Sequence, residues 1–524
     1  MPFFYFFNYL SAFMHIIGVD IGTGSTKAVA VSHSGETIAS TRVSYPTLNA
    51  IPGRSEQDPE VIWQAFIRTL REVVAQTKEQ PYAIALSSAM HSLIPVDNSG
   101  KALQSMITWA DNRSANVASQ LMSSPSGKRL YEETGTPLHA MSPLCKIIWL
   151  RENNPELFSR TARFISIKEF IWFRLFNVFE VDYSIASASG LFNINTLKWH
   201  EDALELAGIT AERLSVPVNT NHTITGVTRV NEVPDGLQNI PFVIGGSDGC
   251  LANKGSYATV PGVAALTIGT SGAIRVARQK PALNWEHMTF NYRLNENVFI
   301  SGGPINNGGI ALKWYAEKLL GKEMNSDAAY TELLSQLSDV PAGSDGLIFL
   351  PYLFGERAPI WNSNAFGVFF GITGQHRQAH FTKAVIEGIL FSLYQIMRGI
   401  ESDGDAISRI HISGGFVRSK QWVQMLATIF GKKVVLVNRE DASAIGAAFL
   451  GFDALGVEGD YEKFSEADAI TFDPQYELHD FYRENVFPLF EGLYRALAPQ
   501  MEKLHKLKSR KNVSTTPLTE EQKL

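Results

Sequence analysis

Short apolar runs alternate with longer amphipathic stretches along most of the chain, a pattern typical of mixed α/β proteins. The first half predicts strands near residues 16–21, 26–33, 36–45 and 83–87, with a helix at 59–75. The second half repeats this order, with strands near 263–268, 273–278, 297–301 and 407–412, and helices near 310–320 and 421–430. Repetition over a domain-sized distance predicts duplicated architecture.

Each half opens with two apolar strands joined by a turn rich in Gly, Thr and Ser. The turns read Ile21-Gly22-Thr23-Gly24-Ser25 and Ile268-Gly269-Thr270-Ser271-Gly272. Glycines let backbone N–H groups surround an anion, and the hydroxyl groups add donors. Only the first turn follows a carboxylate, Asp20, which suits a phosphate-bound Mg²⁺. One such turn alone would be an ordinary tight hairpin, but two favour a nucleotide held between related domains.

Composition fits a large enzyme with two or more domains: 524 residues, 45% hydrophobic and 19% charged. A net charge of -6 argues against general binding to nucleic acid or anionic membranes. Two cysteines, Cys145 and Cys250, cannot build a disulfide framework, which predicts buried thiols and a cytoplasmic location.

The two ends of the chain differ from its body. Residues 1–13 are apolar and aromatic, but they lack a basic segment and are too short to span a bilayer, so Met14 is the expected natural start. Residues 503–524 are polar without apolar periodicity and are expected to form a disordered tail.

Two long segments, Met141–Asn153 and Gly367–Ile372 followed by His380–Glu387, resemble signatures of the FGGY family of carbohydrate kinases. The resemblance covers about residues 14–495. It implies two ribonuclease-H-like domains of the actin, hexokinase and Hsp70 ATPase superfamily, here 14–254 and 255–500, with a cleft between them. It also implies ATP and Mg²⁺ as the phosphoryl donor system and a small sugar or sugar acid as the acceptor.

Within the family, residues 86–93, 141–146 and 246–253 resemble the gluconate kinases most, and the xylulose kinases next. The expected acceptor is therefore the terminal hydroxyl of D-gluconate, with xylulose or another pentulose or polyol as the alternative. A non-catalytic sugar sensor or a chaperone-like ATPase is a remote alternative. The presence of both Asp20 and Asp248 argues against the sensor, and the sugar-site segments argue against the chaperone.

The resemblance assigns the general base to Asp248, which follows a predicted strand at 241–246 and lies between glycines. Asp20 is expected to hold Mg²⁺, with Asp248 as a second metal carboxylate, and Thr23 and Thr270 to contact phosphate from opposite domains. The predicted nucleotide-binding residues are Gly22, Thr23, Gly24, Ser25, Gly269, Thr270, Ser271, Gly303, Asn307, Gly414, Gly415 and Ser419. The small residues of 441–448 predict a closely packed helix at the interdomain hinge.

The predicted sugar-binding residues, besides Asp248, are Met90, His91, Trp109, Asp111 and Arg113. His91 and Arg113 are expected to offer charge or donors to a carboxylate. Lys146 is assigned a structural or general polyol role, and Arg357 a place on a cleft loop without a named partner. Asn362 stands where related kinases often have aspartate, so a charged role there is in doubt. The sequence leaves the oligomeric state open, with a homodimer as one option.

Overall fold

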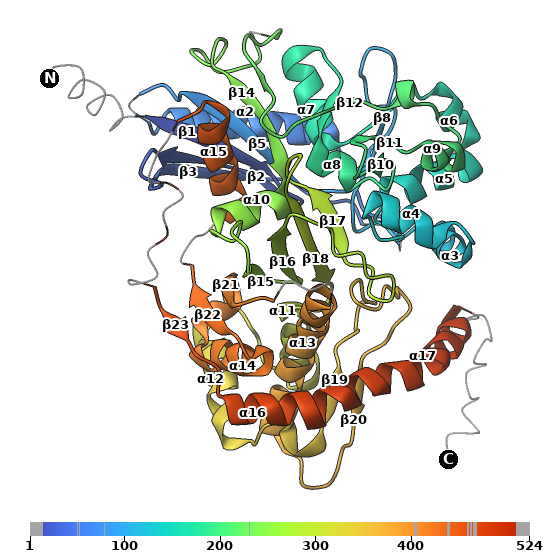
Figure 1. Cartoon of the computed structure of the whole chain (residues 1–524), viewed down its shortest axis with the longest axis vertical. Helices are drawn as coiled ribbons and strands as arrows, with labels where there is room; N and C mark the ends of the chain where they lie inside the picture. The colour runs from blue at the N-terminus through green and yellow to red at the C-terminus, as the bar shows by residue number, and fades with distance from the viewer. Residues whose placement is uncertain are drawn as a thin grey trace, which may run out of the picture.

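Each half of the chain folds around one mixed β-sheet (Figure 1). The computed structural model describes residues 14–509, except 50, 52, 78, 230, 403–405, 438–440, 458–460, 462–463 and 465–468. The first sheet has the order β13 (Thr223–Ile224), β14 (Phe242–Ser247), β5 (Ala83–Ser88), β1 (His15–Ile21), β2 (Ser25–Ser32), β3 (Thr37–Ser44). The second has the order β17 (Phe290–Arg293), β18 (Phe299–Ile305), β16 (Gly272–Arg278), β15 (Val263–Ile268), β21 (Arg409–Ser413), β22 (Lys433–Leu436), β23 (Thr471–Phe472).

The two sheets share one topology. In the first, β3, β2 and β1 form an antiparallel meander, β5 and β14 run parallel to β1, and β13 closes the edge antiparallel. In the second, β18, β16 and β15 form the meander, β21 and β22 follow in parallel, and β23 is antiparallel. The predicted duplication is therefore confirmed, with β17 added at one edge.

The predicted helices are present with small shifts at their ends. Helix α2 (Pro59–Val74) begins after Asp58, whose side chain accepts a hydrogen bond from the Glu60 amide. The predicted helix at 310–320 is α11 (Gly309–Trp314), continued by a π-helical turn at Tyr315–Leu319. The predicted helix at 421–430 is α14 (Lys420–Phe430).

Further elements fill the long connections. In the first half these are α3 (Ala115–Ser123), α4 (Gly127–Thr134), α5 (Pro143–Asn153), α6 (Pro155–Arg160), α7 (Ile167–Phe176), α8 (Tyr183–Ser187), α9 (Glu201–Ala207) and the short strands β4 (Glu56–Gln57), β6 (Ile94–Val96), β7 (Met106–Ile107), β8 (Arg163–Ile165), β9 (Glu180–Asp182), β10 (Phe192–Asn193), β11 (Lys198–Trp199) and β12 (Val216–Val218). The second half adds α12 (Asp327–Leu334), α13 (Gln378–Glu401), α16 (Tyr476–Phe481), β19 (Ile348–Leu350) and β20 (Val368–Phe370).

Alternate residues of β1 face two different layers of helices. Ile17 and Val19 belong to the buried cluster that contains side chains of α2, whereas Ile16 belongs to the cluster that contains α15 (Ala442–Ala454). A Cβ atom at Gly18 would lie 1.8 Å from the Ala444 carbonyl oxygen, so α15 packs directly on the strand backbone. Helix α15 thus covers the first sheet although it lies within 255–500, and a division into 14–254 and 255–500 does not separate the two packed bodies.

Helix α15 also crosses α10 (Asp248–Gly255) at very short range. A Cβ atom at Gly446 would lie 1.9 Å from the Leu251 carbonyl oxygen, and one at Gly255 would lie 2.0 Å from that of Ala442. The closely packed helix predicted at 441–448 is confirmed.

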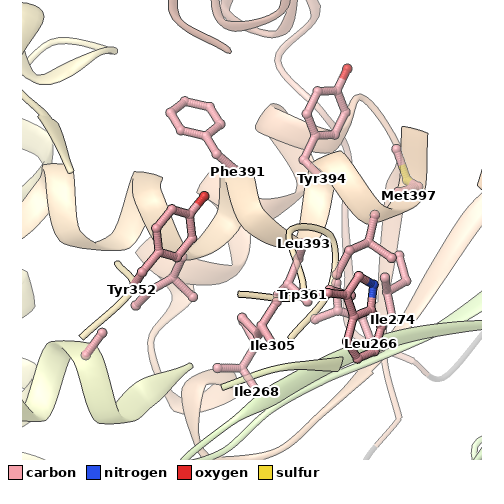
Figure 2. Close-up of a cluster of buried hydrophobic side chains, with 14 of the residues drawn as sticks. Leu266, Ile268, Ile274, Ile305, Tyr352, Trp361, Phe391, Leu393, Tyr394 and Met397 are labelled. Carbon is pink, nitrogen blue, oxygen red and sulfur yellow. The ribbon is translucent and has the colours of Figure 1, made fainter. Parts of the chain in front are cut away.

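The core of the second half lies between its sheet and α13. Leu266 and Ile268 of β15, Ile274 of β16 and Ile305 of β18 meet side chains of α13 such as Leu393 (Figure 2). This packing holds the second hairpin on a rigid base.

Helix α17 (Phe487–Ser509) corrects one prediction. It extends through 503–509, so this part of the expected tail is helical, and residues 510–524 lie outside the described residues. Residues 1–13 also lie outside them. In the part of the chain that the structure describes, no helix has the length and apolar character needed to cross a membrane. Cys145 and Cys250 are free and buried, as predicted.

Candidate active site

Two carboxylates lie at the ends of two parallel strands in the first sheet. Asp20 belongs to β1, Asp248 follows β14, and β5 lies between these strands. The Ser87 hydroxyl of β5 donates a hydrogen bond of 2.8 Å to Asp20 Oδ1. Burial raises the pKa of Asp20, and burial together with the nearby Asp20 charge raises the pKa of Asp248 to about 7. Asp248 is therefore poised to exchange a proton near neutral pH.

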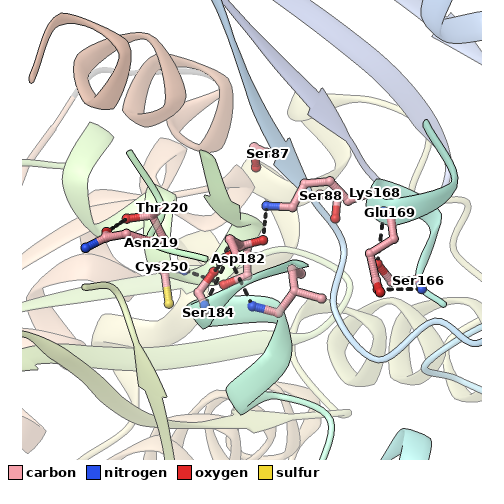
Figure 3. Close-up of polar contacts among 12 residues, drawn as sticks. Ser87, Ser88, Ser166, Lys168, Glu169, Asp182, Ser184, Asn219, Thr220 and Cys250 are labelled. Carbon is pink, nitrogen blue, oxygen red and sulfur yellow. Dashed lines mark hydrogen bonds and ion pairs between the residues drawn. The ribbon is translucent and has the colours of Figure 1, made fainter. Parts of the chain in front are cut away.

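A buried polar network supports the strand end that carries Asp248 (Figure 3). The Ser247 amide donates to Ser184 Oγ at 2.6 Å, and that hydroxyl donates to Asp182 Oδ1 at 2.5 Å. Asp182 in turn pairs with Lys168 at 2.6 Å, and both side chains are buried. The buried pair of Lys168 and Asp182 thus holds the backbone next to Asp248 in place through Ser184.

A cavity of about 300 Å³ joins the two halves at this point. It is lined by Thr23, Met90, His91, Trp109, Asp248, Thr267, Gly269, Ser271, Gly272, Ala273, Arg275, Phe290, Tyr292, Pro304 and Arg357. The structure thereby brings together four of the predicted sugar-site residues with Thr23 and Ser271 of the two hairpins. We call this space the acceptor cavity.

His91 is buried and has a left-handed backbone conformation, with φ of 65°. Its Nδ1–H donates to the Ala188 carbonyl at 2.8 Å, and Nε2 accepts from the Tyr292 hydroxyl at 3.3 Å. Burial and the charge of Lys146 lower the pKa of His91 to about 3. In this arrangement His91 is a neutral member of the cavity wall, which does not favour a role as a source of positive charge for the substrate.

Asp111 and Arg113 are not among the residues that line the acceptor cavity. Arg113 donates to both oxygens of Asp111, at 2.8 and 2.7 Å, and also to Glu56. Its guanidinium lies 5.2 Å from the centre of the Trp149 ring. In this arrangement Arg113 is already paired with two carboxylates, which does not fit the predicted role of free cation for a substrate.

Two other arginines face the cavity instead. Arg275 comes from β16, and Arg357 comes from the loop after β19. Arg357 donates to Asn306 Oδ1 at 2.7 Å, and its guanidinium lies 4.7 Å from the centre of the Trp109 ring. The sequence pointed to the cleft loop of Arg357 but did not single out Arg275. The sequence did contain a signal for Arg275, because an arginine within a strand of apolar residues must meet either a partner or a cavity.

Other polar residues flagged in the sequence hold the framework. Buried Lys146 donates to the carbonyls of His91 and of Thr108, the latter at 2.8 Å, which agrees with a structural role. Asn362 donates to the Tyr494 hydroxyl at 3.2 Å and is not among the residues that line the cavity.

A second cavity, of about 290 Å³, adjoins the second hairpin. Four predicted nucleotide residues line it: Gly269, Thr270, Gly415 and Ser419. Further lining residues that the sequence did not single out include Lys313, Tyr330, Arg418 and Trp422. Gly414 has φ of 106°, and a Cβ atom there would lie 2.5 Å from the Ile268 carbonyl, so only glycine suits the turn into this cavity.

Gly303 and Asn307 do not line this second cavity. A Cβ atom at Gly303 would lie 2.8 Å from both Ala358 and Ile396, within the core. Buried Asn307 donates to the Gly355 carbonyl at 2.7 Å and to Glu356 at 2.8 Å. Neither residue lines either cavity, and Asn307 holds the loop that carries Arg357.

The first hairpin turn is tied to the acceptor cavity through Thr23. Trp109 Nε1–H donates to Thr23 Oγ1 at 2.9 Å, and the Gly22 amide closes the turn by donating to the Ser25 carbonyl at 3.0 Å. Gly22, Gly24 and Ser25 are not among the lining residues of either cavity.

The carboxylates suit a magnesium ion that is shared with phosphate. Among the described residues, no group of three or more His, Cys, Asp or Glu is arranged to hold a metal ion alone. Mg²⁺ is commonly bound by one or two carboxylates together with phosphate oxygens and water. Asp20 and Asp248 fit that donor set.

Comparison with known proteins finds similarity along nearly the whole chain. The N-terminal domain of the FGGY family of carbohydrate kinases matches residues 15–255, and its C-terminal domain matches 264–455. A gluconokinase of Bacillus licheniformis is 40% identical over 493 residues, which cover 92% of this chain and 96% of that protein. A xylulose kinase of Bacillus subtilis is 29% identical over 490 residues, with coverage of 92% and 96%.

Two solved structures from Lactobacillus acidophilus are equally similar to this chain. A gluconate kinase and a ligand-bound xylulose kinase each have a TM-score of 0.87 and 32% identity. Both alignments cover 94% of this chain, with 99% of the gluconate kinase and 100% of the xylulose kinase.

The duplicated fold and these matches define a phosphotransferase that acts on a sugar hydroxyl, with ATP and Mg²⁺ as its donor system. The chain belongs to the FGGY family of carbohydrate kinases. The predicted family and two-domain fold class are confirmed.

Proposed function

We propose that this kinase phosphorylates D-gluconate at its terminal 6-hydroxyl and forms 6-phosphogluconate. The observation that carries the choice of acceptor is the 40% identity to a gluconokinase over 92% of the chain, against 29% for a xylulose kinase over the same share. Overall structure alone does not separate these acceptors, because the two solved structures are equally similar.

In this proposal Asp248 is the general base. Its carboxylate accepts the proton of the 6-hydroxyl while that oxygen forms a bond to the γ-phosphorus and the bond to the ADP oxygen breaks. A pKa near 7 suits this task because the carboxylate is substantially ionised at neutral pH and still holds a proton effectively. The place of Asp248 on the acceptor cavity supports the assignment.

The other predicted residues are assigned to Mg²⁺, phosphate, adenosine or the sugar. Asp20 orients Mg²⁺, which when bound neutralises charge on the phosphates. Thr23 and Thr270 contact phosphate from opposite halves, and Gly415 and Ser419 pack against the adenosine. Met90, His91 and Trp109 shape the wall against which the sugar lies. All of these residues except Asp20 line the acceptor or the second cavity, and this supports the proposal. Asp20 lies on β1, where the Ser87 hydroxyl donates to its carboxylate.

An ATP-coupled assay of the purified protein tests the acceptor. D-gluconate, xylulose, ribulose and glycerol are compared at equal concentrations, and gluconate is expected to have the highest kcat/KM. Turnover of xylulose without turnover of gluconate would assign the protein to the pentulose kinases and would leave the proposed role of Asp248 in place.

We also propose a cytoplasmic location, which two free and buried cysteines support. The homodimer stays a prediction, and light scattering after size-exclusion chromatography measures it directly.

A further inference from the structure

We propose that Arg275 is a specificity-determining residue that binds the carboxylate of the sugar acid and makes the kinase prefer acids to neutral polyols. The inference rests on the proposed function, because it assigns one residue to the charged end of that acceptor. It depends on the side chains that face the acceptor cavity and on the pairing of the cations near it.

The first argument is charge balance. Among the described residues, neither Arg275 nor Arg357 forms an ion pair with a carboxylate, although both line the acceptor cavity. Arg113 is saturated by Asp111 and Glu56, and His91 is neutral. Burial lowers the pKa of both guanidinium groups, and the nearby Asp248 carboxylate opposes this shift without forming an ion pair with either group. The cations of this cavity that are not held in an ion pair therefore lie on the wall formed by the second half.

The second argument separates the two guanidinium groups. Arg357 is held by Asn306, by the Ile305 carbonyl at 3.2 Å and by the Trp109 ring. Arg275 Nη1 is buried and has no hydrogen-bond partner among the described residues. An unpartnered buried guanidinium nitrogen is costly, and an anionic ligand would satisfy it.

The third argument is position. Arg275 lies on β16, paired with Ala265 and Gly302, three residues beyond the Gly272 end of the hairpin. A Cβ atom at Gly249 would lie 3.3 Å from Arg275 Nε and 3.0 Å from Met90 Cε, so Arg275 and Met90 meet over the residue that follows Asp248. An open six-carbon chain can therefore present its terminal hydroxyl to Asp248 and the hairpins while its carboxylate turns toward β16.

These observations predict that the kinase discriminates sugar acids from neutral analogues of the same length. A site built to pair a charged group rejects an analogue that lacks it, because the protein group is then left unpaired. Arginine suits this task because its planar fork donates two parallel hydrogen bonds to a carboxylate.

The test compares D-gluconate with D-gluconamide, which keeps the carbon chain and terminal hydroxyl but replaces the carboxylate with a neutral amide. For the natural sequence we expect kcat/KM to favour gluconate by about 10- to 100-fold. In Arg275→Met this ratio should fall to near one, mainly through the KM for gluconate. Calorimetric titration of gluconate without nucleotide should show the same loss of affinity.

Arg278→Met is the matched control. Arg278 lies on the same strand, three residues further on and hence on the opposite face, where it donates to the Ile400 carbonyl at 3.3 Å. This variant should keep the natural ratio of gluconate to gluconamide. If Arg275→Met does not fold, Arg275→Lys provides the test. Lysine keeps the positive charge but lacks the planar guanidinium group, so the ratio of kcat/KM for gluconate over gluconamide should fall severalfold.

An equal loss for both acceptors in Arg275→Met would overturn the inference, since it would show that Arg275 acts on Asp248 or on the phosphoryl group. An unchanged ratio would also overturn it. Failure of the proposed function is seen separately and first: the unmodified kinase would then turn over xylulose but not gluconate, and the carboxylate role would fall with it.

Discussion

At the scale of single residues, burial decides which groups around the acceptor cavity carry charge. It lowers the pKa of His91 to about 3 and raises that of Asp248 to about 7. Positive charge is left to Arg275 and Arg357, which come from the second half, whereas Asp248 comes from the first. The cavity is thus polarised, with the proton acceptor on one half and unpaired cations on the other.

Replacement of Asp248 by asparagine tests the proposed base. Asp248→Asn preserves size and hydrogen bonding but removes the proton acceptor, so kcat should fall by roughly 10²-fold or more. Affinity for ATP, measured by calorimetry, should stay near that of the unmodified kinase because the second cavity is untouched and Asp20 remains to hold Mg²⁺. Turnover near the normal rate in a correctly folded variant would exclude Asp248 as the base.

Replacement of Arg113 tests whether that side chain is structural. Arg113→Met leaves buried Asp111 without its main cation, and a broken buried pair typically costs about 3–5 kcal/mol. Thermal unfolding should show a lowered Tm. The ratio of kcat/KM for gluconate over gluconamide should stay equal to that of the unmodified kinase.

The outcome that contradicts this view of Arg113 is an unchanged Tm together with a KM that rises for gluconate alone. That result would restore the expectation drawn from the sequence, in which Arg113 binds the carboxylate of the substrate directly.

The residues that could be predicted for the site are those adjacent to motif turns. Thr23, Met90, His91, Trp109 and Asp248 were all selected from the sequence, and all lie on one cavity. Thr23, Met90, His91 and Asp248 follow the ends of β1, β5 and β14, which meet at one edge of the first sheet. Trp109 follows β7, which belongs to a separate two-stranded sheet.

The pairing of cations could not be predicted, because it depends on contacts between distant residues. Arg113 is neutralised in part by Glu56, which lies 57 residues away in the chain. Arg275 stands in a buried strand, where a sequence does not reveal whether the side chain meets a partner or a cavity.

At the scale of elements, the contact between α10 and α15 joins the strand end that carries Asp248 to the second half. The Ser443 hydroxyl of α15 donates to the Asp248 carbonyl at 3.1 Å. Glycines 18, 255 and 446 allow backbone atoms of α15 to touch β1 and α10. The small residues of α15 were visible in the sequence, but its return to the first sheet was not, because chain order alone does not give that packing.

An added methyl group at this contact should be strongly unfavourable. In Gly446→Ala the new Cβ would lie 1.9 Å from the Leu251 carbonyl, so the helices must separate, and we expect a loss of about 1–3 kcal/mol or more. Chemical denaturation measures this loss.

Gly492→Ala is the matched control for the helix contact. Gly492 lies within α17, and a Cβ atom there meets nothing within 4 Å. Alanine should stabilise the helix by up to about 1 kcal/mol. Equal effects of the two substitutions would contradict the close contact between α10 and α15.

At the scale of the whole molecule, the two related bodies meet around the chemistry. The acceptor cavity takes lining residues from both halves, whereas the second cavity is lined by the second half alone. Arg357 of the second half stacks on Trp109 of the first, and Trp109 donates to Thr23 of the first hairpin. A ligand in the acceptor cavity therefore lies against Arg357 and Trp109, whose contact joins the two halves, and against Thr23 of the first hairpin turn.

This arrangement predicts closure of the two halves when both substrates are bound. Exclusion of water favours phosphoryl transfer to the sugar over loss to water, and lid or domain closure is the usual way to achieve it. Small-angle scattering should show a smaller radius of gyration with gluconate and a non-hydrolysable ATP analogue together than without ligands. The analogue alone should produce less change, because the second cavity is lined by one half only. A radius that stays constant at saturation with both ligands would mean that the halves are already closed and that water is excluded by side chains of the acceptor cavity.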